Sequence, residues 1–272
     1  MFLFRNHRPF AHLLALLLLV ALPAAQAGEY AKRRTPEPSG SGARPTVEQS
    51  LAEARACQAR FQRGAAAAAY DRVLRLAPHQ FEALWNRAVL AVQLTFGQTD
   101  KAAQQAAFRL AETLAGRALR LDSTRYEAHF AVALAAGATQ QGGSATERLA
   151  AGKQVRWHAG RALAFNPRHA ESWALLGSWH LGLANLNWAE RLVAGAATAG
   201  ASNEQALHCF RQALRWQPDN LKYYLLAATA CQHLGRRAEG QALLRQALAL
   251  PPVRPEDPQV RQKCTALLPK FS

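Results

Sequence analysis

Acidic side chains are scarce in this chain of 272 residues. Asp and Glu together number 18 against 33 Lys and Arg, which gives a formal net charge of +15. Such an excess favours anionic partners. Most of the basic residues are Arg scattered through an Ala-rich chain, a pattern typical of a solvated helical surface. We therefore expect no nucleic-acid partner, and an anionic envelope polymer or lipid is kept as an alternative contact of the basic surface.

Long apolar runs are also missing, except near the N-terminus. Residues 13–22 form an apolar run of ten residues, too short for a bilayer, which takes about 20. Two Arg precede it, and an Ala-Gln-Ala tripeptide ends at Ala27, which is the layout of a cleaved signal peptide. We expect a secreted or periplasmic chain with no transmembrane segment after cleavage near Ala27. A mitochondrial presequence is the alternative, because no acidic residue precedes Glu29.

Motifs of the common enzyme classes are absent, including HExxH, GxGxxG and GxSxG. The four cysteines, Cys57, Cys209, Cys231 and Cys264, contain no CxxC pair, which argues against zinc and thioredoxin-like sites. We expect them to be buried thiols, although an oxidising compartment permits disulfides. No pair of His stands at metal-ligand spacing with a carboxylate. The chain is therefore expected to be no enzyme and to hold no cofactor or metal.

A short motif recurs five times and ends each time in a residue that stops a helix. The motif has seven positions. The first is Arg or Gln, the second is Val or a small residue, the third is Leu and the fifth is apolar. The fourth and sixth positions vary, and the seventh is Pro or Ser. The copies end at Pro78, Ser123, Pro167, Pro218 and Pro252. Proline cannot continue a helix, and apolar residues recur at helical spacing throughout this region, with no strand-like alternation. The chain is thus predicted to be all-α.

The spacing of these stops is 45, 44, 51 and 34 residues. The last interval is the length of a tetratricopeptide repeat (TPR), a pair of helices. The longer intervals fit the same unit with insertions between its two helices, near 95–107, 139–153 and 184–203. We therefore predict a TPR-like α-solenoid of antiparallel helix pairs, interrupted by three insertions.

One repeat also carries the side-chain signature of a TPR, W-x2-L-G-x2-Y, with His in place of Tyr. Small residues in this signature let two helices approach closely, and large ones fill the space beside them. The packing residues are Trp173, Leu176, Gly177, His180, Ala206, Phe210, Ala213 and Pro218.

The two ends of the array are predicted to be irregular. The first unit consists of helices 46–62 and 65–77, separated by a turn at Gly64. The last helix is expected to begin with Asp257 as its N-cap and Pro258 as its first residue, and to act as a cap. The expected organisation is a signal peptide (1–27), a flexible linker (28–45), a repeat domain (46–256) and a capping helix with a tail (257–272).

The C-terminal half has a more specific layout, in which a stop motif precedes a Trp-rich helix and a Trp-containing insertion follows it. The segments concerned are 161–167, Trp173, Leu176-Gly177, Trp179, Trp188, 206–210, 247–251 and Leu267-Leu268. From about Trp157 to Phe271 this layout resembles the regulator of microtubule dynamics family. The resemblance implies a TPR-like helical interaction protein, and no catalytic residues carry over. Because the export signal separates the chain from tubulin, we do not expect microtubule association.

Helical phase places a row of apolar residues on the first helix of each pair. These first helices line the groove of a TPR protein. The candidate groove residues are Trp85, Val89, Phe130, Leu134, Ser178, Leu181, Leu225, Thr229 and Gln232. Trp85 and Trp188 are candidate anchors for a partner. The leading hypothesis is a non-enzymatic exported scaffold or adaptor that binds a protein or peptide along its concave face. The alternative is a cell-envelope assembly protein whose basic surface contacts anionic polymer or lipid.

Overall fold

The structure, a computed structural model, describes residues 45–139, 145–194 and 200–271. The predicted signal peptide and nearly all of the predicted linker lie outside these ranges. Regular structure within them is entirely helical. The helices are α3 (Val47–Ala59), α4 (Arg63–Leu76), α5 (Phe81–Gln93), α6 (Lys101–Leu121), α7 (Tyr126–Thr139), α8 (Ala145–Phe165), α9 (Ala170–Ala184), α10 (Trp188–Ala194), α11 (Asn203–Trp216), α12 (Leu221–His233), α13 (Arg237–Ala249) and α14 (Asp257–Leu267), followed by the 3-10 helix η2 (Leu268–Phe271).

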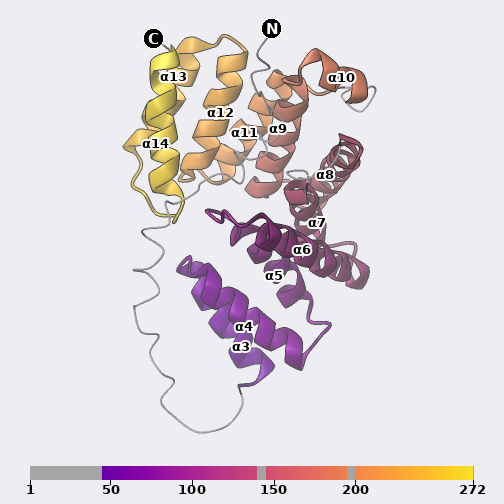
Figure 1. Cartoon of the computed structure of the whole chain (residues 1–272). Helices are drawn as coiled ribbons and strands as arrows, with labels where there is room; N and C mark the ends of the chain where they lie inside the picture. The colour runs from indigo at the N-terminus through magenta and orange to yellow at the C-terminus, as the bar shows by residue number, and fades with distance from the viewer. Residues whose placement is uncertain (1–44, 140–144, 195–199, 272) are drawn as a thin grey trace.

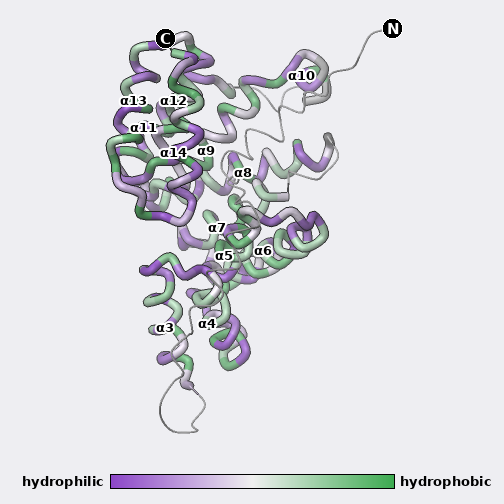
Figure 2. The backbone as a smooth tube through the Cα atoms, turned by 60° about the vertical axis from the view of Figure 1, so that its left-hand side comes forward, coloured by the Kyte–Doolittle hydropathy of each residue, from purple (hydrophilic) through white to green (hydrophobic). Residues whose placement is uncertain are grey.

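Consecutive helices pack as pairs, and each pair packs on the next (Figure 1). The pairs are α3–α4, α5–α6, α7–α8, α9–α11 and α12–α13, and α14 covers the last of them. Hydrophilic and apolar residues are interleaved along most helices (Figure 2), as expected for helices with one buried and one solvent-facing side. The predicted TPR-like solenoid of helix pairs is therefore confirmed.

The predicted stops end the second helix of each pair. Helices α4, α6, α8 and α11 each end two residues before a stop residue. The residues that directly precede Pro78 and Pro218 explain this, because both have left the helical region. Ala77 has a φ of −134° and a ψ of 84°, and Gln217 has a φ of −137° and a ψ of 75°. A following proline excludes the α conformation sterically.

Each of the first two insertions lengthens the helix that follows it. Helices α6 and α8 each have 21 residues, whereas α5 has 13 and α7 has 14. The extra residues lie at the N-terminal ends of α6 and α8, within the insertions predicted near 95–107 and 139–153. The third insertion contains the short helix α10.

Two boundary predictions were wrong by a residue or more. Gly64 lies inside α4, and the chain turns instead at Phe61, which adopts the left-handed conformation with φ of 55°. Asp257 is the first residue of α14, not its N-cap. Its carboxylate accepts hydrogen bonds from the backbone N–H groups of Val253 (2.8 Å) and Arg254 (2.7 Å), so it orders the preceding turn.

Close approach of the two helices explains the TPR signature. A Cβ atom added to Gly177 on α9 would lie 2.7 Å from the ring of Phe210 and 3.0 Å from Cβ of Cys209, both on α11. Ala206 and Ala213 on the same helix are fully buried. The two helices therefore pack closely at these residues, and only glycine fits at position 177 without movement of α11.

A second role of the signature is to hold the turn between repeats. In three repeats, a ring nitrogen or hydroxyl on the first helix contacts the carbonyl of the stop residue six positions earlier. The contacts are His129 Nε2 to Ser123 (3.0 Å), Trp173 Nε1 to Pro167 (2.8 Å) and the Tyr224 hydroxyl to Pro218 (2.9 Å). The aromatic position thus needs a hydrogen-bond donor as well as bulk.

The array curls back so that its first helix pair meets the turn before its last helix. Arg63 Nη2, at the start of α4, lies 2.6 Å from Glu256 Oε2, although 193 positions separate the two residues. Both side chains are only 17% exposed. Next to this pair, the Arg254 guanidinium lies 6.0 Å from the ring centre of Phe61. These contacts close the two ends of the solenoid against each other.

Substitution of Gly177 by Ala tests the close approach of α9 and α11. Because the new methyl group overlaps the Phe210 ring, we expect a loss of about 1–3 kcal/mol in the free energy of unfolding, measured by urea denaturation. Gly182→Ala is the matched control on the same helix, where an added Cβ meets nothing within 4 Å. That control should be neutral or stabilising, since Ala favours a helix over Gly. Equal effects of the two substitutions would contradict the packing account.

Candidate functional site

The predicted groove lies on the side of the array formed by α5, α7, α9 and α12, here called the inner face. Of the nine candidate residues, Trp85 and Leu134 are half-buried and Gln232 is exposed. The other six are buried: Val89, Phe130, Ser178, Leu181, Leu225 and Thr229.

The buried candidates are core residues, which corrects their assignment to an open groove. Val89 and Phe130 share one apolar cluster, with Trp85 and Leu134 packed against it. Leu181 and Leu225 belong to a second, larger cluster. The hydroxyls of Ser178 and Thr229 donate to the carbonyls one turn earlier in their own helices. These six side chains therefore present little or no surface to a partner in this structure.

The inner face exposes few side chains along its length. Every residue of α5, α7 and α9 is buried or half-buried, and on α12 only its last two residues, Gln232 and His233, are exposed. Near the closing contact, burial lowers the pKa of Lys222 on α12 to about 8, although Glu256 acts in the opposite direction. The contact between the two ends of the array therefore lies beside a Lys222 side chain that is largely withdrawn from water.

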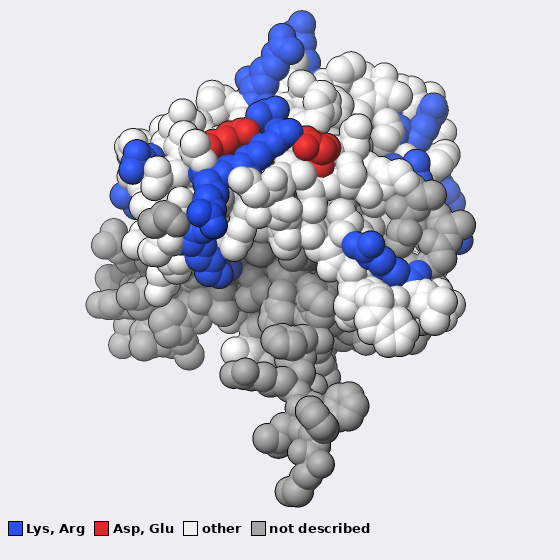
Figure 3. Space-filling model, turned by 90° about the horizontal axis from the view of Figure 1, so that it is seen from above, with Lys and Arg blue, Asp and Glu red and all other residues white. Residues whose placement is uncertain are grey.

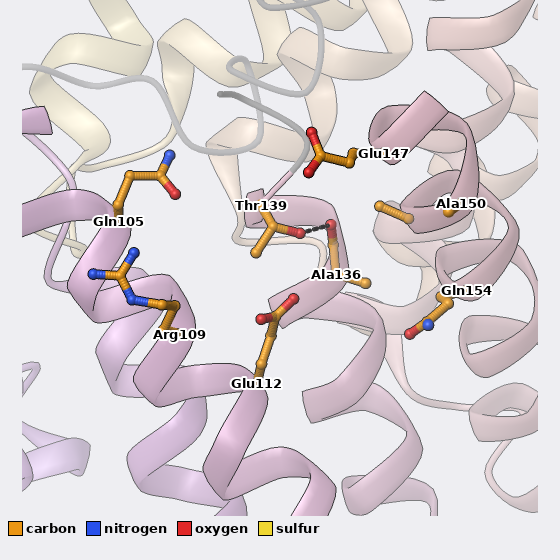
Figure 4. Close-up of a pocket in the computed structure, with 9 residues that line it drawn as sticks. Gln105, Arg109, Glu112, Ala136, Thr139, Glu147, Ala150 and Gln154 are labelled. Atoms are coloured by element: carbon orange, nitrogen blue, oxygen red, sulfur yellow. Dashed lines mark hydrogen bonds between the residues drawn. The ribbon is translucent and has the colours of Figure 1, made fainter. Parts of the chain in front are cut away.

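An open pocket of about 480 Å³ lies where the lengthened ends of α6 and α8 extend past α7 (Figure 4). Its volume is in the range of ligand-binding cavities, about 300–1,000 Å³. It is lined by Gln105, Arg109 and Glu112 from α6, by Ala136 and Thr139 from α7, and by Glu147, Ala150, Ala151 and Gln154 from α8.

The pocket combines small apolar surfaces with polar groups of several kinds. In Figure 4, the carboxylates of Glu112 and Glu147 lie on either side of Thr139, and the Arg109 guanidinium lies on the α6 side. The Thr139 hydroxyl donates to the Ala136 carbonyl (2.9 Å), so its hydrogen is already used. Carboxylate, amide and guanidinium groups can together contact the backbone and a charged side chain of a peptide.

The sequence predicted the insertions that form this pocket, but not the pocket itself. A sign was available, because Ala, which favours helices, is frequent in the inserted residues of α6 and α8, whereas α7 ends at Thr139. Unequal lengths of neighbouring helices leave the longer ones unsupported at one end. None of the predicted groove residues lines the pocket.

His129 and His158 form a hydrogen-bonded pair between α7 and α8. Their Nδ1 atoms are 2.9 Å apart. Because the Ser123 carbonyl can only accept, His129 Nε2 carries the hydrogen, and His158 must donate from Nδ1 to His129. Burial lowers the pKa of His129, and it lowers that of His158 to about 4, with His129 as a smaller cause. Two neutral imidazoles therefore link the helices, and neither lines the pocket.

The cysteines are free thiols, as predicted. Cys209, Cys231 and Cys264 are buried and Cys57 is half-buried. Burial raises the pKa of Cys209 and of Cys231 to about 12, and that of Cys264 to about 11. These three side chains are core residues rather than nucleophiles. Among the described residues, no cluster of three or more His, Cys, Asp or Glu could hold a metal ion.

Known proteins with similar sequences share one family. Regulator of microtubule dynamics protein 3 of Bos taurus is 27% identical over 164 residues, which is 58% of this chain and 35% of that protein. The same protein of Mus musculus is 28% identical over 116 residues, 41% of this chain and 25% of that protein. The chain thus matches about a third or less of the length of each of these relatives.

Similarity to solved structures supports the fold. A thermophilic TPR protein of Thermus thermophilus superposes with a TM-score of 0.57 at 20% sequence identity, over 82% of this chain and 99% of the other. The family model described as "Regulator of microtubule dynamics protein 1-3" matches residues 50–272. This range includes most of the first helix pair and the capping helix, so it extends well beyond the C-terminal half whose layout resembles the family. The chain therefore belongs to the regulator of microtubule dynamics protein 1-3 family.

Proposed function

We propose that this protein is a non-enzymatic scaffold that binds a segment of a partner protein in the pocket between α6, α7 and α8. The observation that supports this site is the pocket itself, since it is open to solvent and formed by the insertions that distinguish these repeats. The inner face, which TPR proteins use in helix-in-groove or extended binding modes, presents only Trp85, Leu134 and Gln232 of the predicted residues.

The chemistry of the pocket favours an extended peptide segment. Gln105 and Gln154, on opposite walls, each have an amide that can donate to and accept from a peptide backbone. The small side chains of Ala150 and Ala151 leave room in the pocket for a side chain of the partner. Arg109 supplies a positive charge, and Glu112 and Glu147 supply carboxylates, so the partner segment is expected to be polar and to carry a charged residue.

A bulky side chain in the pocket should block the partner. Ala150 is exposed on α8 and lines the pocket, so Ala150→Trp fills the space without disturbing the core. We expect proteins captured from the native extract by the tagged chain to be lost, or reduced at least about tenfold, which corresponds to about 1.4 kcal/mol of binding free energy.

Ala164→Trp is the control for this experiment, because Ala164 is also exposed on α8 but lies outside the pocket. It should leave capture unchanged. Equal capture by both variants, with helicity unchanged, would contradict the pocket as the binding site, and equal loss from both would show that the effect is not specific to it.

We further propose that the scaffold acts outside the cytoplasm, in the periplasm or the secreted fraction. The proposal is supported by the basic residues, apolar run and Ala-Gln-Ala tripeptide of residues 1–27. N-terminal sequencing of the chain purified from its native cells is expected to begin at Gly28. A chain that still begins at Met1 would refute export by cleavage, and a start elsewhere in the linker would favour the mitochondrial alternative.

A further inference from the structure

The third insertion displays two large apolar side chains in solvent. Trp188 and Leu192 on α10 are 80% and 77% exposed, more than any other large hydrophobic residue in the described ranges. They are four positions apart, so they lie on the same side of the helix. Burial of such side chains in an apolar environment is worth about 1.5–3 kcal/mol each, and their exposure therefore calls for a partner.

Helix α10 is held in place by its polar residues. The backbone N–H of Glu190 donates to Asn187 Oδ1 (2.9 Å), and that of Asn187 donates to Glu190 Oε2 (3.0 Å), which forms a cap at the start of the helix. Arg191 donates from Nε to the Leu186 carbonyl (3.0 Å) and from Nη2 to the Ala184 carbonyl (2.8 Å). These bonds tie α10 to the end of α9, while its apolar pair remains exposed.

The end of the array that carries α10 is rich in cations. Figure 3 looks down on this end, where Lys and Arg side chains outnumber Asp and Glu. Arg236, in the turn after α12, is paired with Glu204. Arg237 begins α13, and Lys270 precedes Phe271, whose ring packs on Gly240 near the start of the same helix. Arg237 and Lys270 are exposed, and within the described part of the chain neither of these two side chains has a hydrogen-bond or ion-pair partner.

We propose that this end of the protein docks on an anionic lipid bilayer, with Trp188 and Leu192 in the interfacial layer and Arg237 and Lys270 near the headgroups. Tryptophan favours the membrane–water interface, and basic residues near an anionic surface each add about 1 kcal/mol. One weak apolar anchor and a basic patch together suffice for reversible attachment. A protein partner would need a contact area of about 1,000 Å², whereas α10 offers two isolated side chains. This proposal is independent of the pocket.

Vesicle co-sedimentation of the full chain tests the proposal. The probe is phosphatidylcholine vesicles with phosphatidylglycerol, compared with pure phosphatidylcholine. We expect binding to the anionic vesicles that weakens with added salt, and a partition coefficient about tenfold lower for the Trp188→Ala/Leu192→Ala variant. Since all variants retain residues 1–44, the difference between them reports on α10. Arg237→Glu/Lys270→Glu should also weaken binding, which tests the surface without any change to α10.

Trp157→Ala is the matched control, because Trp157 is 58% exposed but lies on α8. It should bind anionic vesicles within about twofold of the unsubstituted chain. The proposal is overturned if both double variants sediment like the unsubstituted chain, or if neutral and anionic vesicles bind equally. It is also overturned if Trp188→Ala/Leu192→Ala instead changes the oligomeric state without lipid, because α10 would then be an interface between copies of the chain.

Discussion

The close approach of the two helices within each pair is the constraint on which the rest of this structure depends. Gly177 permits it against Phe210, and fully buried alanines such as Ala206 and Ala213 permit it along the same interface. Small residues shorten the distance between helices, and the rotation from each pair to the next then sets the curvature of the solenoid. The outcome of that curvature is the contact between Arg63 and Glu256, which joins segments from opposite ends of the chain.

Packing between neighbouring helix pairs limits which surfaces can meet a partner. The inner face is occupied by its own side chains, and Lys222 beside the closing contact is sufficiently buried for its pKa to fall to about 8. The accessible features are instead the ones that the insertions add: the pocket between the lengthened α6 and α8, and the exposed Trp188 and Leu192 of α10. In this family member, departures from the regular repeat supply the candidate binding surfaces.

Much of the fold could be predicted from the sequence because its determinants are local. A proline fixes the end of a helix through a steric clash with the residue before it, as Ala77 before Pro78 shows. The TPR signature likewise fixed the pairing of α9 with α11 through Gly177 and Phe210. The turn at Phe61 was missed because Gly64 is the residue that normally marks a turn, whereas here a non-glycine residue takes the left-handed conformation.

The site could not be predicted in the same way, because exposure depends on packing between repeats far apart in sequence. Helical phase correctly placed Leu181 and Leu225 on the first helices of their pairs, but phase alone does not show that neighbouring repeats bury them. The same limit applies to the pocket, which needs the N-terminal parts of α6 and α8 to extend past the end of α7, one on each side of it. Trp188 could be recognised as unusual from its place in an insertion, but its exposure had to be seen in the structure.

Contact between the two ends of the array can be measured directly by cross-linking. Gln62 and Pro255 are exposed neighbours of Arg63 and Glu256, so cysteines at these two positions, in a Cys57→Ser background, should be joined within one chain by a short bis-maleimide. The buried native thiols, with their raised pKa values, should not compete. The account predicts a rapid intramolecular cross-link in the monomer that is lost on unfolding. Failure to cross-link, with both single-cysteine variants readily modified, would show that the two ends of the array lie apart and would contradict the contact between Arg63 and Glu256.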